Sequence, residues 1–344
     1  MFDLVVPTLG RPSLAVLLET LAGLQGTRPE RVLVVDDRRD RSEPLNVDGA
    51  VEILEGPARG PAAARNVGWR ASGAAWVVFL DDDVVPTDTW LIDLEADLMS
   101  APLDVVAVQG RVTVPLPVDR RPTDWERNVT GLETARWITA DMAVRRGALA
   151  KVGGFDERFT RAYREDADLA IRLQKEGGRL TVGERRVDHP VRPAPWWVSL
   201  RNQAGNRDDV LMATLHGRDW EGAGAPRRRR PRHLATTLCG VAGLAGVGLG
   251  NRRLARSGLA GWLIGTVELA WARIAPGPGR PKEVAAMVAT SVAMPPVATW
   301  HWLAALARRR KLLAAPGPGT ETARRAPVSS SPATPASGSG RRAG

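Results

Sequence analysis

Cysteine is almost absent from this sequence of 344 residues. The single cysteine, Cys239, excludes a disulfide framework within the chain and a zinc site built from cysteine thiolates. This composition suits a reducing compartment. The beginning of the sequence also lacks the basic segment of a secretory signal peptide, because Met1 is followed directly by a strand-like stretch. We therefore expect a cytoplasmic protein.

Acidic residues are scarce in the last third of the sequence. Residues 1–217 hold 28 Lys and Arg against 33 Asp and Glu, whereas residues 218–344 hold 20 against 5. Such asymmetry predicts a polyanionic partner for the basic region, either nucleic acid or an anionic membrane surface. Nucleic acid is the less favoured partner, because aromatic and basic residues are not interleaved and no nucleic-acid-binding fold is recognisable.

Uninterrupted apolar runs of the length of a bilayer span are also missing. A span needs about 20 apolar residues. The apolar stretch 234–250 is short and rich in glycine, and the stretch 284–307 is interrupted by Pro295 and Pro296. Interfacial helices flanked by arginines fit better, so we expect this region to contact an anionic membrane surface at the inner face of the cell membrane. The alternative is a helical hairpin packed on the preceding domain.

Changes in composition divide the chain into four parts. We expect one domain over residues 1–217, a basic linker over 218–233 and an apolar helical region over 234–312. Residues 313–344 are rich in Pro, Gly, Ser, Thr and Ala, a composition typical of a disordered tail.

The first part alternates between strand and helix patterns. The predicted strands cover residues 2–9, 31–37, 50–54, 75–80 and 104–110, and the predicted helices cover 12–24, 60–72 and 166–176. Nearly continuous apolar strands separated by helices indicate an α/β fold with a doubly wound, mostly parallel sheet. Ligands of such sheets bind beyond the carboxyl ends of the strands, which is where Asp36-Asp37 and Asp81-Asp82-Asp83 are expected.

The three adjacent acids that follow the strand 75–80 need a chemical explanation. Carboxylates spaced as Asp81 and Asp83 are hard oxygen ligands that suit Mg²⁺ or Mn²⁺, and such ions complete their shell with water and substrate phosphates. In an extended segment these two point the same way, so Asp82 is expected to point elsewhere and to be replaceable. The alternative is an acidic turn that caps the next helix.

Five segments together resemble a known family. They are "VVPTLGRP" (5–12), "VLVVDD" (32–37), "GPAAARNVGWRASGAAWVVFLDDDV" (60–84), "GGFDERF" (153–159) and "REDADLAIRLQKEGGRL" (164–180). In this order they resemble the family 2 glycosyltransferases, inverting enzymes of the GT-A fold. The resemblance covers roughly residues 2–215 and implies a nucleotide-diphosphate sugar donor and a divalent cation, Mn²⁺ or Mg²⁺.

The resemblance also implies roles for single residues. The nucleotide-sugar would be bound by Pro7, Thr8, Asp36 or Asp37, Arg65 of the "ARN" motif, and Asp81. The metal would be held by Asp81 and Asp83, with Asp83 as the direct ligand.

The catalytic base implied by the resemblance is Asp166, the second acid of the "ED" pair. A carboxylate in reach of the attacking hydroxyl can accept its proton. His189 in "VDHPV" is either a further metal ligand or a loop histidine before a proline, and both interpretations stay open. The segment 139–146 departs from the usual family pattern, which leaves acceptor recognition in doubt.

The sequence therefore predicts metal-assisted transfer of a sugar to an acceptor hydroxyl, with inversion. The acceptor is unknown, and a lipid-linked or cell-envelope glycan would suit a membrane-bound enzyme. Two other interpretations are kept. A metal-dependent phosphotransferase would carry its D-x-D at the first strand, whereas here it follows the fourth. A non-catalytic membrane-associated protein with a sugar-nucleotide fold would be expected to lack the base or the D-x-D. An oxidoreductase is disfavoured because no G-x-G-x-x-G follows the first strand.

Overall fold

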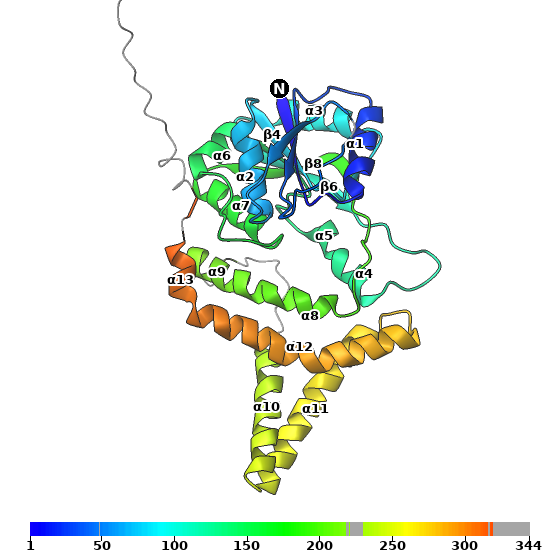
Figure 1. The fold of residues 1–344 in the computed structure, drawn as a ribbon, viewed down its shortest axis with the longest axis vertical. Coiled ribbons are helices and arrows are strands. Elements are labelled where there is room, and N and C mark those ends of the chain that lie inside the picture. The colour runs from blue at the N-terminus through cyan, green and yellow to red at the C-terminus, as the bar shows by residue number, and fades with distance from the viewer. Residues whose placement is uncertain (48, 218–219, 221–229, 316, 319–344) are drawn as a thin grey trace, which may run out of the picture.

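The structure is a computed structural model, and it describes residues 1–47, 49–217, 220, 230–315 and 317–318. A domain built around one β-sheet, here called the sheet domain, is followed by a layer of helices (Figure 1). Part of this layer extends away from the sheet as a hairpin of two long helices.

The sheet has eight strands in the order β3-β2-β1-β4-β7-β6-β8-β5. Their bounds are β1 Phe2–Thr8, β2 Val32–Asp36, β3 Glu52–Glu55, β4 Trp76–Leu80, β5 Val85–Pro86, β6 Val105–Thr113, β7 Asp141–Arg145 and β8 Arg179–Asp188. Strands β1 to β4 are parallel, as are β6 and β8, whereas β7 runs antiparallel to β4 and β6. The predicted α/β class with a mostly parallel sheet is therefore confirmed.

Helices cover both faces of this sheet. The helices of the sheet domain are α1 Ser13–Gly23, α2 Pro61–Ala71, α3 Trp90–Ser100, α4 Asp124–Val129, α5 Gly131–Thr134, α6 Arg146–Val152, α7 Glu165–Lys175, α8 Val198–Asn202 and α9 Asn206–His216, with a 3-10 turn η1 at Gln203–Gly205. One apolar core contains leucines of α1 and α3, and a second contains apolar residues of α2, α6 and α7. The domain is doubly wound, as expected from the alternating patterns.

Strand β7 was not predicted, although it lies in the middle of the sheet. It begins with Asp141, a charge that sequence patterns place at a surface. In the structure Asp141 is fully buried because the Arg185 Nε donates to its Oδ1 at 2.8 Å and the Trp90 indole donates to its Oδ2 at 2.8 Å. Pairing removes most of the cost of burying this carboxylate.

The helical module comprises α10 Arg230–Gly248, α11 Arg252–Ile274, α12 Pro281–Ala307 and α13 Arg309–Ala314. We call α10 and α11, residues 230–274, the hairpin. Its two helices can approach closely because Gly258 has no side chain. A Cβ at this position would collide with the backbone nitrogen of Gly243. Pro295 and Pro296 interrupt the apolar run but not the helix, since α12 continues through both.

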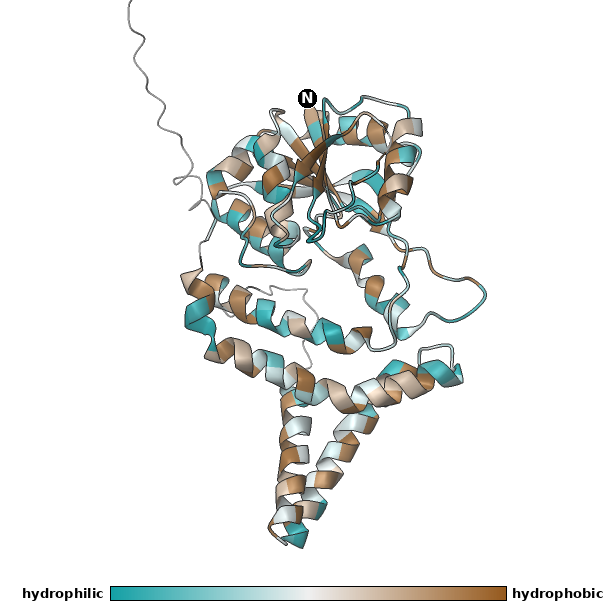
Figure 2. Cartoon of the chain, viewed as in Figure 1, coloured by the Kyte–Doolittle hydropathy of each residue, from teal (hydrophilic) through white to brown (hydrophobic). Residues whose placement is uncertain are grey.

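Apolar residues occur along both helices of the hairpin (Figure 2). The exposed large apolar residues there are Leu238, Val241, Leu244, Val247, Leu249, Leu259, Leu263, Ile264, Val267 and Trp271. Among the helices that the structure describes, none combines the length and the hydropathy needed to cross a bilayer.

Two predicted boundaries need correction. Residues 218–219 and 221–229 of the expected linker lie outside the described residues, but its last residues, 230–233, already belong to α10. Most of the expected tail, 319–344, also lies outside the described residues, and residues 313–314 end α13 instead. This last helix forms because Leu312 packs against the small core around Phe159 and Leu211.

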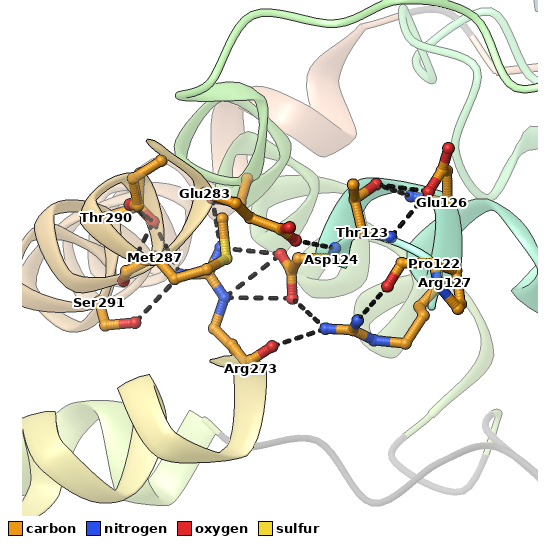
Figure 3. A network of polar contacts seen from close by, with 12 residues as sticks. Pro122, Thr123, Asp124, Glu126, Arg127, Arg273, Glu283, Met287, Thr290 and Ser291 are labelled. Atoms are coloured by element: carbon orange, nitrogen blue, oxygen red, sulfur yellow. Dashed lines mark hydrogen bonds and ion pairs between the residues drawn. The ribbon is translucent and has the colours of Figure 1, made fainter. Parts of the chain in front are cut away.

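A polar network joins the helical module to α4 (Figure 3). The Arg273 guanidinium of α11 pairs with Asp124 at 2.8 Å and donates to the Thr290 and Ser291 hydroxyls of α12 at 2.8 and 3.1 Å. Glu283 accepts a bond from the Asp124 backbone at 3.0 Å. Because Arg273 is largely buried, this contact fixes α4 against the module more firmly than an exposed ion pair would.

Candidate active site

The predicted metal ligands come together at the end of β4. Asp81, Asp83 and His189 each offer one ligand atom, and these atoms lie within 4.8 Å of one another. His189 reaches this place because it directly follows β8, and its backbone nitrogen donates to the Thr113 carbonyl at 2.7 Å. Burial, and next the charge of Asp81, raise the pKa of Asp83. A divalent cation bound here would relieve both effects.

This donor set fits the cation that the sequence suggests. Two carboxylates suit Mg²⁺ and Mn²⁺ alike, and an imidazole nitrogen favours the transition metal of the two. The separation of the three ligand atoms leaves space for an ion and for oxygen ligands from a substrate.

Arg192 is a site residue that the sequence patterns did not reveal. Its Nε lies 2.8 Å from Asp83 Oδ2, opposite the 3.5 Å contact of His189 Nε2 with Oδ1. The backbone oxygen of Arg192 accepts a bond of 2.8 Å from the Trp125 indole of α4. The only sequence signal was its place three residues after His189 in "HPVR".

Asp82 points away from this group, as expected, but it is not replaceable. Its Oδ2 accepts a bond from the Thr8 hydroxyl at 2.7 Å, and its Oδ1 pairs with Arg11 at 2.8 Å. The residue is only 2% exposed. Removing a buried carboxylate that ties the end of β1 to the end of β4 would leave two donors without partners.

Arg65 connects the acidic strand end to α7. Its Nη2 donates to Asp81 at 2.7 Å and its Nη1 to Glu165 at 3.0 Å, with the guanidinium only 2% exposed. Arg65 reaches this position because α2 begins sharply at Gly60, where φ is +103° and a Cβ would collide with the Thr160 carbonyl oxygen.

The residues predicted for the nucleotide lie at the ends of β1 and β2. Asp36 is held by a forked pair with Arg38, whose hydrogen bonds lower the pKa of this carboxyl. Asp37 accepts bonds from the Ala58 and Gly60 backbone at 2.7 and 2.8 Å, and burial raises its pKa.

Two of the residues predicted to bind the nucleotide, Asp37 and Thr8, hold neighbouring parts of the protein in place. Both Asp37 oxygens hold the loop before α2, and the Thr8 hydroxyl is engaged with Asp82. Pro7 is half-buried beside Thr8. Both Asp37 oxygens and the Thr8 hydroxyl thus have partners within the protein, and their role in nucleotide binding stays a prediction.

The predicted base lies in the first turn of α7. Arg164 precedes the helix with a left-handed φ of +80°, and its guanidinium pairs with Asp209 of α9 at 3.1 Å. Burial raises the pKa of Asp166, whose Oδ1 also accepts a bond from the Ala167 nitrogen at 2.7 Å. Burial, and next Asp166, raise the pKa of Glu165 to about 8. Asp166 is the more exposed of the two and thus the better placed to meet a substrate.

Comparison with known proteins agrees with these motifs. The model of the family described as glycosyl transferase family 2 matches residues 3–167. The pre-mycofactocin glycosyltransferases of two Mycobacterium tuberculosis strains, CDC 1551 / Oshkosh and ATCC 25618 / H37Rv, are 35% identical to this chain over 199 residues. That alignment covers 51% of this chain and 39% of the relatives, so the chain spans well under half the length of these curated proteins.

Solved structures with a similar chain path include TarS residues 1–349 of S. aureus, with a TM-score of 0.43 and 14% identity over 90% of this chain and 91% of TarS. Glucosyl-3-phosphoglycerate synthase from Mycobacterium tuberculosis, in complex with Mn²⁺, uridine diphosphate and phosphoglyceric acid, gives a TM-score of 0.44 and 13% identity over 62% of this chain and 78% of that one. The matched region of the present chain contains β1 to β4, the acidic triplet and the start of α7. Over residues 3–167, the sheet domain of this chain is thus similar to glycosyl transferase family 2.

Proposed function

We propose that this chain transfers a sugar from a nucleotide-diphosphate sugar to an acceptor hydroxyl, with inversion at the anomeric carbon. The observation that carries the proposal is the arrangement around Arg65. One end of its guanidinium holds Asp81 of the metal group, and the other end holds Glu165, next to the base Asp166. A cation site and a proton acceptor at one edge of the sheet are the minimum set for this displacement.

The proposed reaction is a direct displacement. The acceptor oxygen forms a bond to the anomeric carbon while the bond from that carbon to the diphosphate oxygen breaks, and the hydroxyl proton passes to Asp166. Burial favours this transfer because it raises the pKa of Asp166 and makes the carboxylate a stronger base. A divalent cation held by Asp81, Asp83 and His189 supplies positive charge to the leaving diphosphate.

Other residues of the site position these groups. Arg65 and Glu165 hold the end of β4 and the start of α7 at a fixed separation. Pro7, Thr8, Asp36 and Asp37 shape the nucleotide edge.

The experiment that tests the proposal measures the melting temperature of the protein with a panel of sugar nucleotides. We expect one nucleotide-sugar to stabilise the protein in Mn²⁺ or Mg²⁺ and not in EDTA, because a ligand that binds only the folded state raises its stability. The Asp83→Asn variant should lose this metal-dependent shift. The proposal is rejected if no member of the panel raises the melting temperature with either metal.

We further propose that a family 2 domain of GT-A type over residues 1–217 is presented to an anionic membrane surface at the inner face of the cell membrane by the apolar helical region, 234–312. The hairpin supports this proposal because it combines exposed apolar side chains with Arg252, Arg253 and Arg256 near its tip. A lipid-linked or cell-envelope acceptor would then meet the enzyme at that surface.

Flotation with vesicles that contain phosphatidylglycerol tests the membrane proposal. The unmodified protein should float with the vesicles, whereas a variant with Leu244→Ser and Val247→Ser on the hairpin should stay in solution. Val118→Ser is the control, since Val118 is also an exposed apolar residue but belongs to the sheet domain. Equal flotation of both variants would reject the hairpin as the contact.

A further inference from the structure

A cavity lies between the sheet domain and the end of the helical module. It has a volume of about 580 Å³ and is walled by α2, by the loop 155–160 and by α12 and α13. None of the residues proposed above as metal ligands, base or nucleotide contacts lines it. Its size lies within the usual range of small-molecule sites.

The lining of this cavity is strongly basic. We call it the basic cavity, after the residues Arg59, Arg70, Arg158, Arg207, Arg308 and Lys311 in its wall. Its one acidic lining residue, Glu157, already pairs with Arg59 at 2.6 Å and approaches Arg70 at 3.6 Å. Arg158 is neutralised by a forked pair with Asp156.

Two of these cations remain without a counter-charge. Within the part of the chain that the structure describes, Arg308 and Lys311 have no ion pair. Arg207 has none either, but its charge acts on the neighbouring carboxylate of Asp208, which is fully buried and does not line the cavity. Uncompensated charges of one sign in a concave wall focus the electrostatic potential and attract ions of the opposite sign.

Apolar residues also line the cavity, namely Phe155, Trp300, Ala304, Ala305 and Leu312. Burial lowers the pKa of His301, a further lining residue, which disfavours its positively charged form. A ligand that fills the cavity would therefore combine an anionic group with an apolar or flat part.

We propose that the basic cavity binds a phosphate-bearing small molecule at a site separate from the donor site. Phosphate suits this wall because guanidinium groups bind its oxygens in forked geometry, and a lysine adds a point charge. The site needs the helical module, because Arg308 joins α12 to α13 and Lys311 lies in α13, whereas Arg207 of α9 comes from the sheet domain.

The cavity lies next to the residue that organises the active site. Asn66 lines it, and the preceding residue is Arg65. Phe155 also lines it. The Arg65 guanidinium lies over the Phe155 ring, 5.7 Å from its centre, and the same ring packs edge-on against Phe79 of β4. A ligand against Phe155 therefore contacts the support of Arg65 without touching the metal group.

Calorimetric titration with inorganic pyrophosphate in EDTA tests this proposal, because EDTA removes the metal-dependent affinity of the donor site. We expect one saturable site in the full chain. Arg308→Glu and Lys311→Glu should each weaken binding by roughly tenfold, since each replaces an attraction by a repulsion. Both side chains are exposed, so neither variant is expected to disturb folding. Arg280→Glu makes the same charge change at the other end of α12, on an exposed side chain, and should bind like the unmodified protein.

One further variant separates the two anion sites. Arg192→Gln removes the cation beside Asp83, which is the natural place for pyrophosphate in the donor site. Binding that is weakened by Arg192→Gln but not by Arg308→Glu would assign the anion to the donor site and overturn the proposal. Absence of saturable binding would overturn it too. Neither result depends on the outcome of the sugar-nucleotide panel.

Discussion

The sheet domain and the helical module place charged and apolar groups in opposite ways. The sheet domain buries charges, as in the Asp81–Arg65–Glu165 chain. The module buries few charges but leaves large apolar side chains such as Ile264 and Trp271 exposed on the hairpin.

This difference indicates a chemical role for the sheet domain and a contact role for the helical module. Buried charges are costly unless they are paired, so a domain that retains them gains fixed geometry rather than stability. Exposed apolar surface of this extent in a folded chain is typical of a site that contacts another protein or a membrane.

The two regions meet through polar contacts. Arg273 of the module holds Asp124 of α4, and the neighbouring Trp125 donates to the backbone of Arg192, whose side chain lies on Asp83. Continuous contacts therefore run from the hairpin to the metal group. The predictions below test the two regions and this junction, from the largest expected effect to the smallest.

The largest effect is expected from Asp166→Asn. The amide has nearly the shape of the carboxylate but cannot accept the proton, so the transfer rate should fall by about 10³. Stabilisation by the donor with metal should remain, and melting curves measure that. Glu19→Gln on α1 serves as the control. Turnover above a tenth of the normal rate would remove Asp166 as the base.

Arg65→Met should affect stability most in the sheet domain. It leaves Asp81 and Glu165 without their shared partner, and breaking such a buried pair costs roughly 3–5 kcal/mol. Chemical denaturation measures this loss. Arg70→Met, one turn further along α2 and partly exposed, is the matched control and should cost less than about 1 kcal/mol. Equal losses for the two variants would contradict the central role of Arg65.

Arg273→Met should loosen the junction. We expect a loss of about 2 kcal/mol and faster amide hydrogen exchange in α4, because Asp124 and two hydroxyls lose their donor. Arg232→Met, which breaks the exposed pair with Glu268 on the same hairpin, should change stability by less than about 0.5 kcal/mol. Unchanged exchange in α4 would show that the module does not hold it.

The smallest effect concerns Asp208, whose carboxyl oxygens are buried without a hydrogen-bond partner among the described residues. Burial raises the pKa of Asp208 to about 6. Between the usual value near 3.8 and about 6 the folded state binds more protons than the unfolded state, so this group lowers stability as the pH rises through that window.

Asp208→Asn should therefore stabilise the protein by about 1 kcal/mol at pH 7.5, and the gain should vanish below about pH 3, where the acid is neutral in both states. Melting temperatures of both proteins across this range measure the effect. A gain that is the same at all pH values would exclude titration of Asp208 as its cause.

The site residues were predictable to different degrees. Asp81 and Asp83 follow a buried strand, so the rule that ligands bind at strand ends predicted their place, whereas for His189 the sequence left a metal ligand and a loop histidine both open. Arg192 and strand β7 were missed because a lone arginine and a strand that begins with Asp141 carry no periodic pattern. The replaceable role expected for Asp82 was wrong because the sequence does not show that Thr8 and Arg11 meet it.

The sequence by itself determined the alternation of strands and helices in the first part of the sheet domain, the acidic strand end and the apolar, basic character of the module. These features follow from local periodicity and composition, which neighbouring residues carry. The tertiary structure alone decided which charges pair, since Arg65 meets a glutamate 100 residues away and Arg273 an aspartate 149 residues before it. Such pairs form only where folding brings segments that are distant in the sequence into contact. That contact depends on the packing of the sheet and helices rather than on local pattern.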